Sequence, residues 1–211
     1  MRPRAIARSR RRGCYLAGVG RVQHAADLVW SLSDISLPDG DNQEFRLGDL
    51  WATQTVVLIH LRHFGCILCR HHASRLRDSN AAFEQAGARL VAVGTGGREY
   101  AKTFVTERKI PYLVLVDKQL ATHDLIGIKS GSPMGILKPG TLYAASKALA
   151  AGERQGKSGP NPFLFGASHV IAAGGTLRYA WLNRDYQENA PVEELLAAAQ
   201  DAARAPASTS A

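Results

Sequence analysis

Two cysteines, Cys66 and Cys69, have the spacing of a redox-active pair. They lie in segment 64–70, Phe-Gly-Cys-Ile-Leu-Cys-Arg, between a short β-branched apolar run at 55–61 and a stretch from about 69 to 86 with helical periodicity. Backbone N–H groups and the dipole at a helix N-terminus favour a thiolate over a thiol. The thiolate is the species that attacks disulfides and peroxides. We therefore predict that Cys66 is the attacking thiolate and that Cys69, one turn later, resolves it as an intramolecular disulfide.

Charged neighbours strengthen this prediction. Arg62 and Arg70 flank the pair, and both would lower the pKa of Cys66 if their guanidinium groups lay close to it. His63 could share a proton with Cys66. The alternative is that the two cysteines are inert core residues, because free cysteine is among the most buried residue types.

A metal site is a further alternative. Six residues of the types that bind zinc fall in one short window, namely His60, His63, Cys66, Cys69, His71 and His72. However, His60 belongs to the predicted strand, the adjacent His71 and His72 diverge on the helix, and the usual distant second pair of ligands is missing. We assign no metal ligand, and a non-catalytic binding module stabilised by zinc through this cluster stays as the alternative function.

The surrounding elements alternate between strands and helices. The patterns predict strands at 55–61, 89–93 and 112–116, helices at 69–86, 99–108, 120–126 and 192–203, and a hairpin of strands 168–172 and 176–181. Strands that alternate with helices indicate a largely parallel sheet, and the hairpin makes one side of it antiparallel. The fold class is therefore α/β, with a central mixed sheet and helices on both faces.

One segment interrupts the alternation. Residues 130–162 are rich in Gly, Pro, Ser and Lys and contain one helical piece at about 141–151. We interpret this segment as an insertion near the edge of the sheet that could act as a lid. We expect one domain over residues 28–203, preceded by a disordered Arg-rich arm at 1–27 and followed by a disordered tail at 204–211.

The charge of the chain is concentrated in that arm. The net charge is +8, but seven arginines precede residue 27, and without them 19 basic residues face 18 acidic ones. The domain is thus nearly neutral, and we expect no nucleic-acid partner. An Arg-rich arm could be an organelle transit peptide, a weak twin-arginine signal, a tail for acidic surfaces, or an extension without a role. With three cysteines and no apolar run long enough for a membrane span, we expect a cytoplasmic protein that does not bind membranes.

Three features resemble the thioredoxin fold: the Cys-x-x-Cys pair after a buried strand, Pro111-Tyr112 leading through a strand to Asp117, and the hairpin around 170–175. Over about residues 28–203 the chain is similar to the peroxiredoxin-like branch of the AhpC/TSA superfamily, and segment 61–70 most resembles the prostamide/prostaglandin F synthase-like group. The resemblance implies a thioredoxin-like fold and thiol-dependent redox chemistry without a tightly bound organic cofactor. The implied partners are a peroxide, endoperoxide or disulfide as substrate and thioredoxin or a low-molecular-weight thiol as reductant.

Overall fold

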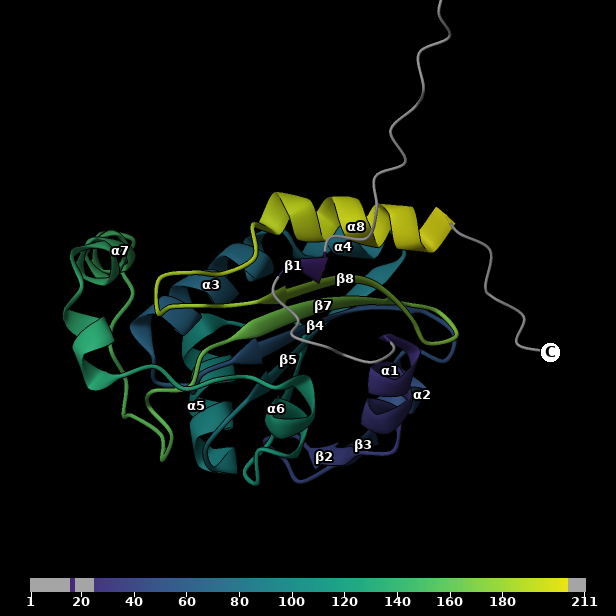
Figure 1. The fold of residues 1–211 in the computed structure, drawn as a ribbon, viewed down its shortest axis with the longest axis horizontal. Coiled ribbons are helices and arrows are strands. Elements are labelled where there is room, and N and C mark those ends of the chain that lie inside the picture. Colours follow the sequence, from purple (N-terminus) through teal and green to yellow (C-terminus); the bar gives the residue numbers. More distant parts are fainter. Residues whose placement is uncertain (1–15, 18–24, 205–211) are drawn as a thin grey trace, which may run out of the picture.

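A six-stranded mixed sheet forms the centre of the molecule, in the order β1-β8-β7-β4-β5-β6 (Figure 1). The computed structural model describes residues 16–17 and 25–204. The strands are β1 (Leu16–Ala17), β4 (Thr55–Leu61), β5 (Ala88–Gly94), β6 (Leu113–Val116), β7 (Ala167–Ala172) and β8 (Thr176–Leu182), and a separate ribbon pairs β2 (Ser36–Pro38) with β3 (Glu44–Arg46). Strands β4, β5 and β6 are parallel, whereas β7 runs antiparallel to both β4 and β8. This arrangement confirms the predicted mixed sheet.

Helices cover both faces of this sheet. They are α1 (Ala25–Ser33), α2 (Leu47–Leu50), α3 (Ile67–Asp78), α4 (Asn80–Gln85), α5 (Arg98–Arg108), α6 (Ala121–Ile126), α7 (Pro139–Ala150) and α8 (Val192–Arg204), with a 3-10 helix η1 (Pro133–Leu137). Buried residues of α3, α4, α5 and α8 form one apolar core, and those of α1, α2 and α6 form the other. In Figure 1, α8 and α4 lie above the sheet, while α1 and α2 lie below it.

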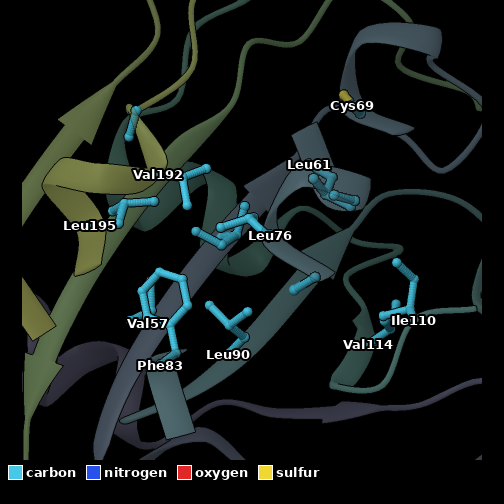
Figure 2. Packing of buried hydrophobic residues seen from close by; sticks show 14 of the residues in the cluster. Val57, Leu61, Cys69, Leu76, Phe83, Leu90, Ile110, Val114, Val192 and Leu195 are labelled. Atoms are coloured by element: carbon cyan, nitrogen blue, oxygen red, sulfur yellow. The ribbon is translucent and has the colours of Figure 1, made fainter. Parts of the chain in front are cut away.

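Strand β4 separates the two cores. All seven of its residues are buried, because β5 and β7 flank it on either side. Val57, Ile59 and Leu61 face the core under α3 and α8, whereas Val56 and Leu58 face the opposite core, as strand geometry requires. Figure 2 shows Val57 and Leu61 beside the side chains of α3 and α8. The prediction of a buried strand at 55–61 is thus confirmed, and this strand carries the chain to the cysteines.

The prediction of one continuous helix at 69–86 is wrong. The chain forms two helices, α3 and α4, which meet at Ser79 (φ −101°, ψ 1°). The Ser79 N–H is shared between the carbonyls of Arg75 and Leu76, and this tightens the last turn of α3. The apolar face is nevertheless as expected, since Cys69, Ala73, Leu76 and Phe83 are all buried.

The N-terminal boundary also differs from the prediction. The expected arm at 1–27 contains β1, which pairs in parallel with β8, and the start of α1, and neither element was predicted from the sequence. Leu28, Val29 and Leu32 of α1 pack into the core, while Trp30 is 75 % exposed. The remaining residues of the arm, with Cys14, and the tail beyond Arg204 lie outside the described residues.

The insertion at 130–162 forms η1, α7 and an extended segment that returns to β7. Helix α7 stands away from the sheet in Figure 1, yet its Ala148 is fully buried beside α3. Across the described residues, none of the helices combines the length and the apolar character that crossing a membrane requires.

Candidate active site

The dithiol lies where β4 gives way to α3. Cys66 is the N-cap residue of α3, with extended backbone (φ −68°, ψ 121°), and its carbonyl accepts the first helical hydrogen bond from Arg70 N–H at 2.9 Å. Cys69 occupies the first turn of the same helix. Both are free thiols, so the structure represents the reduced state. Their placement confirms the predicted position of the pair at a strand-to-helix junction.

Arg62 supplies the positive charge at Cys66. Its Nη1 donates to Cys66 Sγ at 3.0 Å. The guanidinium is fixed by two backbone carbonyls, since Nε donates to Leu164 at 2.6 Å and Nη2 to Tyr186 at 3.1 Å. The same group lies 4.5 Å from the centroid of the Tyr186 ring. Because the planar guanidinium is held by these contacts, its orientation is fixed, and one N–H stays directed at the Cys66 sulfur.

The two thiols differ in acidity. The pKa of Cys66 is lowered to about 6, mainly because Cys69 donates a hydrogen bond to its sulfur; burial opposes ionisation, and the charge of Arg62 favours it. The pKa of Cys69 is raised well above its ordinary value, because ionisation would break that hydrogen bond and because the side chain is buried. At neutral pH Cys66 is therefore the thiolate and Cys69 the thiol. These are the states that the proposed attacking and resolving roles require.

Two of the predicted neighbours do not act on Cys66. Arg70 donates instead to the Arg154 carbonyl at 3.0 Å and pairs with Glu107. The side chain of His63 accepts a hydrogen bond from Gly159 N–H at 3.4 Å, and burial together with Arg62 lowers its pKa to about 4. His63 is therefore neutral at pH 7. The expectation that Arg70 would acidify the thiol is wrong, because its position on the first turn of α3 directs it toward α5.

A strap, defined here as residues 153–159, packs against the residues on both sides of Cys66. Gly156 N–H donates to the Gly65 carbonyl at 2.8 Å, and Ile67 N–H donates to Gln155 Oε1 at 3.0 Å. Between these two flanking residues, Cys66 is only 5 % exposed, and Cys69 in the same apolar core is 6 % exposed. A segment almost ninety residues later in the chain therefore packs against the start of the helix.

The strap is anchored at its first residue. Glu153 is buried and accepts hydrogen bonds from Ser74 Oγ at 2.6 Å and from Arg108 Nη1 at 2.6 Å. These contacts tie the strap to α3 and α5. A buried carboxylate that keeps both a cation and a hydroxyl as partners is a firm attachment point, since loss of either leaves a costly unsatisfied charge.

Replacement of Gly65 by alanine is expected to push the strap off the dithiol. A Cβ on Gly65 would collide with the backbone carbonyl of Lys157, and backbone cannot move aside as a flexible side chain can. We expect Cys66 to react with iodoacetamide several-fold faster than in the wild type, with a loss of about 1–3 kcal/mol in the free energy of unfolding. Gly97→Ala is the matched control, because its Cβ would make only ordinary contact with Tyr100. Unchanged alkylation of Gly65→Ala would contradict the covering role of the strap.

The Cys/His cluster considered for zinc does not assemble. Over residues 16–17 and 25–204, no group of three or more His, Cys, Asp or Glu side chains is arranged to hold a metal ion. His60 alternates with Ile59 and Leu61 along β4, so it faces the other side of the sheet from the dithiol, against His123 and His169. The geometry therefore does not favour the zinc-stabilised module.

The sheet order, the buried strand β4 and the dithiol at the start of the following helix define a thioredoxin-fold protein with a cysteine site. The chain belongs to the AhpC/TSA family, whose sequence model matches residues 31–173. Membership in this family gives the chain, at a coarse level, the character of a thiol-dependent redox enzyme.

Curated relatives agree with this assignment. The chain is 32 % identical to thioredoxin-like protein AAED1, chloroplastic, of Arabidopsis thaliana over 115 residues, which are 54 % of this chain and 45 % of that protein. It is 29 % identical to prostamide/prostaglandin F synthase of Bos taurus over 163 residues, which are 72 % of this chain and 77 % of that protein. The chain thus spans less than half the length of the first relative and about three quarters of the second.

Solved structures share the fold. Peroxidoxin BcpB from Mycobacterium tuberculosis superposes with a TM-score of 0.60 at 19 % identity, over 81 % of this chain and 94 % of that one. Peroxiredoxin Q from Xanthomonas campestris gives a TM-score of 0.61 at 14 % identity, over 83 % and 95 %. These likenesses confirm the predicted thioredoxin-like fold.

Proposed function

We propose that this protein is a thiol-dependent oxidoreductase that reduces a peroxide, endoperoxide or disulfide through Cys66 and Cys69. The observation that carries the proposal is the environment of Cys66 Sγ, which lies 3.0 Å from Arg62 Nη1 and accepts a hydrogen bond from Cys69. A thiolate with a cation and a second thiol beside it has both the nucleophile and the resolving group of a two-electron cycle.

With a peroxide, the Cys66 thiolate attacks one oxygen, the O–O bond breaks, and the leaving oxygen takes a proton to become an alcohol or water. Arg62 stabilises the negative charge that develops on that leaving oxygen. The Cys66 sulfenic acid then reacts with the Cys69 thiol, which forms the disulfide and releases water. With a disulfide substrate, Cys66 forms a mixed disulfide, and Cys69 displaces the second thiol.

An external thiol, such as thioredoxin or a low-molecular-weight thiol, returns the protein to the dithiol. Because both sulfurs are almost fully buried, each half of the cycle begins with movement of the strap, which thus acts as the lid of the site. The same residues fit general peroxide reduction and a specialised biosynthetic reduction.

Intact mass spectrometry tests the assignment. In a Cys14→Ser background, which leaves only the dithiol, the reduced protein is treated with one equivalent of hydrogen peroxide and then with dimedone. In the protein that keeps both Cys66 and Cys69, we expect a loss of two hydrogens as the disulfide forms. In Cys69→Ser we expect a dimedone adduct on Cys66, and in Cys66→Ser we expect no adduct.

Other results would change the assignment. An adduct found only on Cys69 would reverse the two roles. No reaction with excess peroxide, together with rapid mixed-disulfide formation by Cys69→Ser on 5,5′-dithiobis(2-nitrobenzoate), would assign the site to disulfides. No reaction with either reagent would contradict the proposed function.

A further inference from the structure

A pocket of about 540 Å³ opens between α5 and the strap, and we call it the basic pocket. It is lined by Phe64, Gly65, Arg70, Tyr100, Thr103, Glu107, Arg108, Arg154, Gln155, Gly156 and Lys157. This volume suits a small molecule and is far too small for a protein partner. Its walls come from the loop before Cys66, from α3, from α5 and from the strap, so it belongs to the surroundings of the dithiol.

The pocket carries an excess of positive charge. Four cationic side chains line it, against the single carboxylate of Glu107. Arg70 pairs with Glu107 and Arg108 with Glu153, but within the described residues Arg154 and Lys157 form no ion pair. A concave wall of uncompensated cations concentrates anions.

Arg70 adds a buried donor to this wall. Its side chain is only 6 % exposed, and its Nε has no hydrogen-bond partner among the residues that the structure describes. A buried donor without a partner is uncommon in native proteins and is accounted for when a ligand or water completes it. Arg70, a lining residue, therefore brings both positive charge and an unpaired donor to the wall of the pocket.

The pocket adjoins the reactive cysteine. Gly65, the residue before Cys66, lines it, and Gln155, another lining residue, accepts the hydrogen bond from Ile67 N–H on the other side of Cys66. A ligand in the basic pocket thus contacts the strap at Gln155 and Gly156, which hydrogen-bond to the residues on either side of Cys66. Binding there places the ligand next to the one segment that must move before Cys66 can react.

We infer that the basic pocket binds the carboxylate groups of a small anionic thiol, the molecule that reduces the Cys66–Cys69 disulfide. This inference rests on the dithiol cycle proposed above. The lining favours a hydrophilic anion over a lipid, because Phe64 and Tyr100 supply its aromatic surface, and seven further lining side chains are charged or carry an amide or hydroxyl group. A peroxide as small as hydrogen peroxide needs no such pocket.

The chemistry is a pair of thiol–disulfide exchanges. The bound thiolate attacks Cys66 Sγ, the disulfide bond breaks, and Cys69 leaves with the electron pair and takes up a proton. A second small thiolate then attacks the small-molecule sulfur of the mixed disulfide, which releases the small disulfide and the Cys66 thiolate. Two thiols are oxidised and one protein disulfide is reduced.

Reduction by thiols of different charge tests the inference. The oxidised Cys14→Ser protein is reduced with 3-mercaptopropionate, 2-mercaptoethanol or cysteamine, which are anionic, neutral and cationic. Each rate is expressed per thiolate and divided by the rate of the same thiol with 2-hydroxyethyl disulfide. We expect the anionic thiol to be favoured over the neutral one about tenfold and the cationic one to be disfavoured, with both differences shrinking in 0.5 M salt.

Charge variants locate the effect. The double substitution Arg154→Gln with Lys157→Gln is expected to lower the anionic-to-neutral rate ratio about tenfold, whereas Arg204→Gln, the exposed last residue of α8, removes a charge elsewhere and is expected to keep the ratio. Equal normalised rates for all three thiols would overturn this inference while leaving the dithiol cycle intact. Failure of every thiol to reduce the protein, or of the disulfide to form, would overturn both.

Discussion

Substitution of Arg62 by methionine is expected to raise the pKa of Cys66 from about 6 to above about 8 and to slow its alkylation at pH 7 at least about tenfold. The hydrogen bond from Cys69 would remain, but burial would then act on a thiolate that has lost the guanidinium at 3.0 Å. Methionine keeps an unbranched apolar stem while it removes the guanidinium and its charge. The pH profile of iodoacetamide reaction and the thiolate absorbance near 240 nm measure the pKa directly.

Two controls separate charge from folding. Arg62→Lys keeps the charge but lacks the fork that holds Leu164 and Tyr186, so it is expected to give an intermediate pKa. Either substitution deprives buried carbonyls of a donor, which costs about 1–3 kcal/mol each, and thermal unfolding followed by circular dichroism records that loss. A pKa that stays near 6 in a folded Arg62→Met protein would show that Cys69 alone maintains the thiolate.

Acid is expected to unfold this protein before pH 4. His60 and His169 are buried together on the face of the sheet opposite the dithiol, where their rings lie 5.9 Å apart. Burial lowers the pKa of His169 to about 4 and that of His60 well below its ordinary value, with His123 and His169 adding to the effect on His60. His72 and His63 elsewhere in the fold also have a pKa of about 4, again mainly through burial.

The sign of the effect follows from these directions. A histidine whose pKa is lowered on folding binds its proton more readily in the unfolded chain, so stability is fully present above pH 6.5 and is lost as the pH falls toward 4. Each histidine with a pKa of about 4 then costs on the order of 3 kcal/mol. Asp117, whose lowered pKa results from hydrogen bonds with His123 and Thr122 that outweigh burial, adds a further loss below its ordinary value of 3.8. Together, the losses from His169, His72 and His63 are of the same size as the 5–15 kcal/mol that stabilises a typical domain.

Urea unfolding between pH 8 and pH 4.5 measures this dependence. The free energy of unfolding is expected to be level above pH 7 and to fall steeply below pH 6.5. His169→Leu should flatten that slope at little cost at pH 7, because within the described part of the chain neither ring nitrogen of His169 has a hydrogen-bond partner. His71→Gln, on the partly exposed face of α3, serves as the control for loss of a histidine. A stability that stays level to pH 4.5, or an equal slope in His169→Leu, would contradict the role of these buried rings.

Local patterns of apolar and turn-forming residues in the sequence were sufficient to predict much of the fold. Strand β4 and the hairpin of β7 and β8 were predicted within one residue of their observed ends, because their apolar runs are short and bounded by clear turn residues. The break at Ser79 was not predicted, since the apolar face continues through it to Phe83 and only the backbone changes direction.

The site was less predictable than the fold. The cysteine pair and the nearness of Arg62 follow from sequence spacing. The partners that aim Arg62, namely the carbonyls of Leu164 and Tyr186, lie more than one hundred residues away along the chain. The strap that covers Cys66 comes from an insertion without periodicity, and the contacts that hold it are backbone groups and polar side chains, which carry no pattern in sequence. The buried histidine pair was missed because His60 was considered only with the cysteines, and His169, on the predicted strand 168–172, was not considered as its neighbour across the sheet.

The composition of the strap determines how temperature acts on it. Residues 153–159 contain no apolar side chain and are held by hydrogen bonds and one ion pair. Lifting such a segment exposes little hydrocarbon of its own to water, so the heat capacity changes little between the covered and uncovered forms. The logarithm of the equilibrium constant for uncovering should then vary almost linearly with reciprocal temperature. The same plot for unfolding of the whole domain is curved, because unfolding exposes the apolar core. Access to the sulfur is in this respect thermally independent of the stability of the fold beneath it.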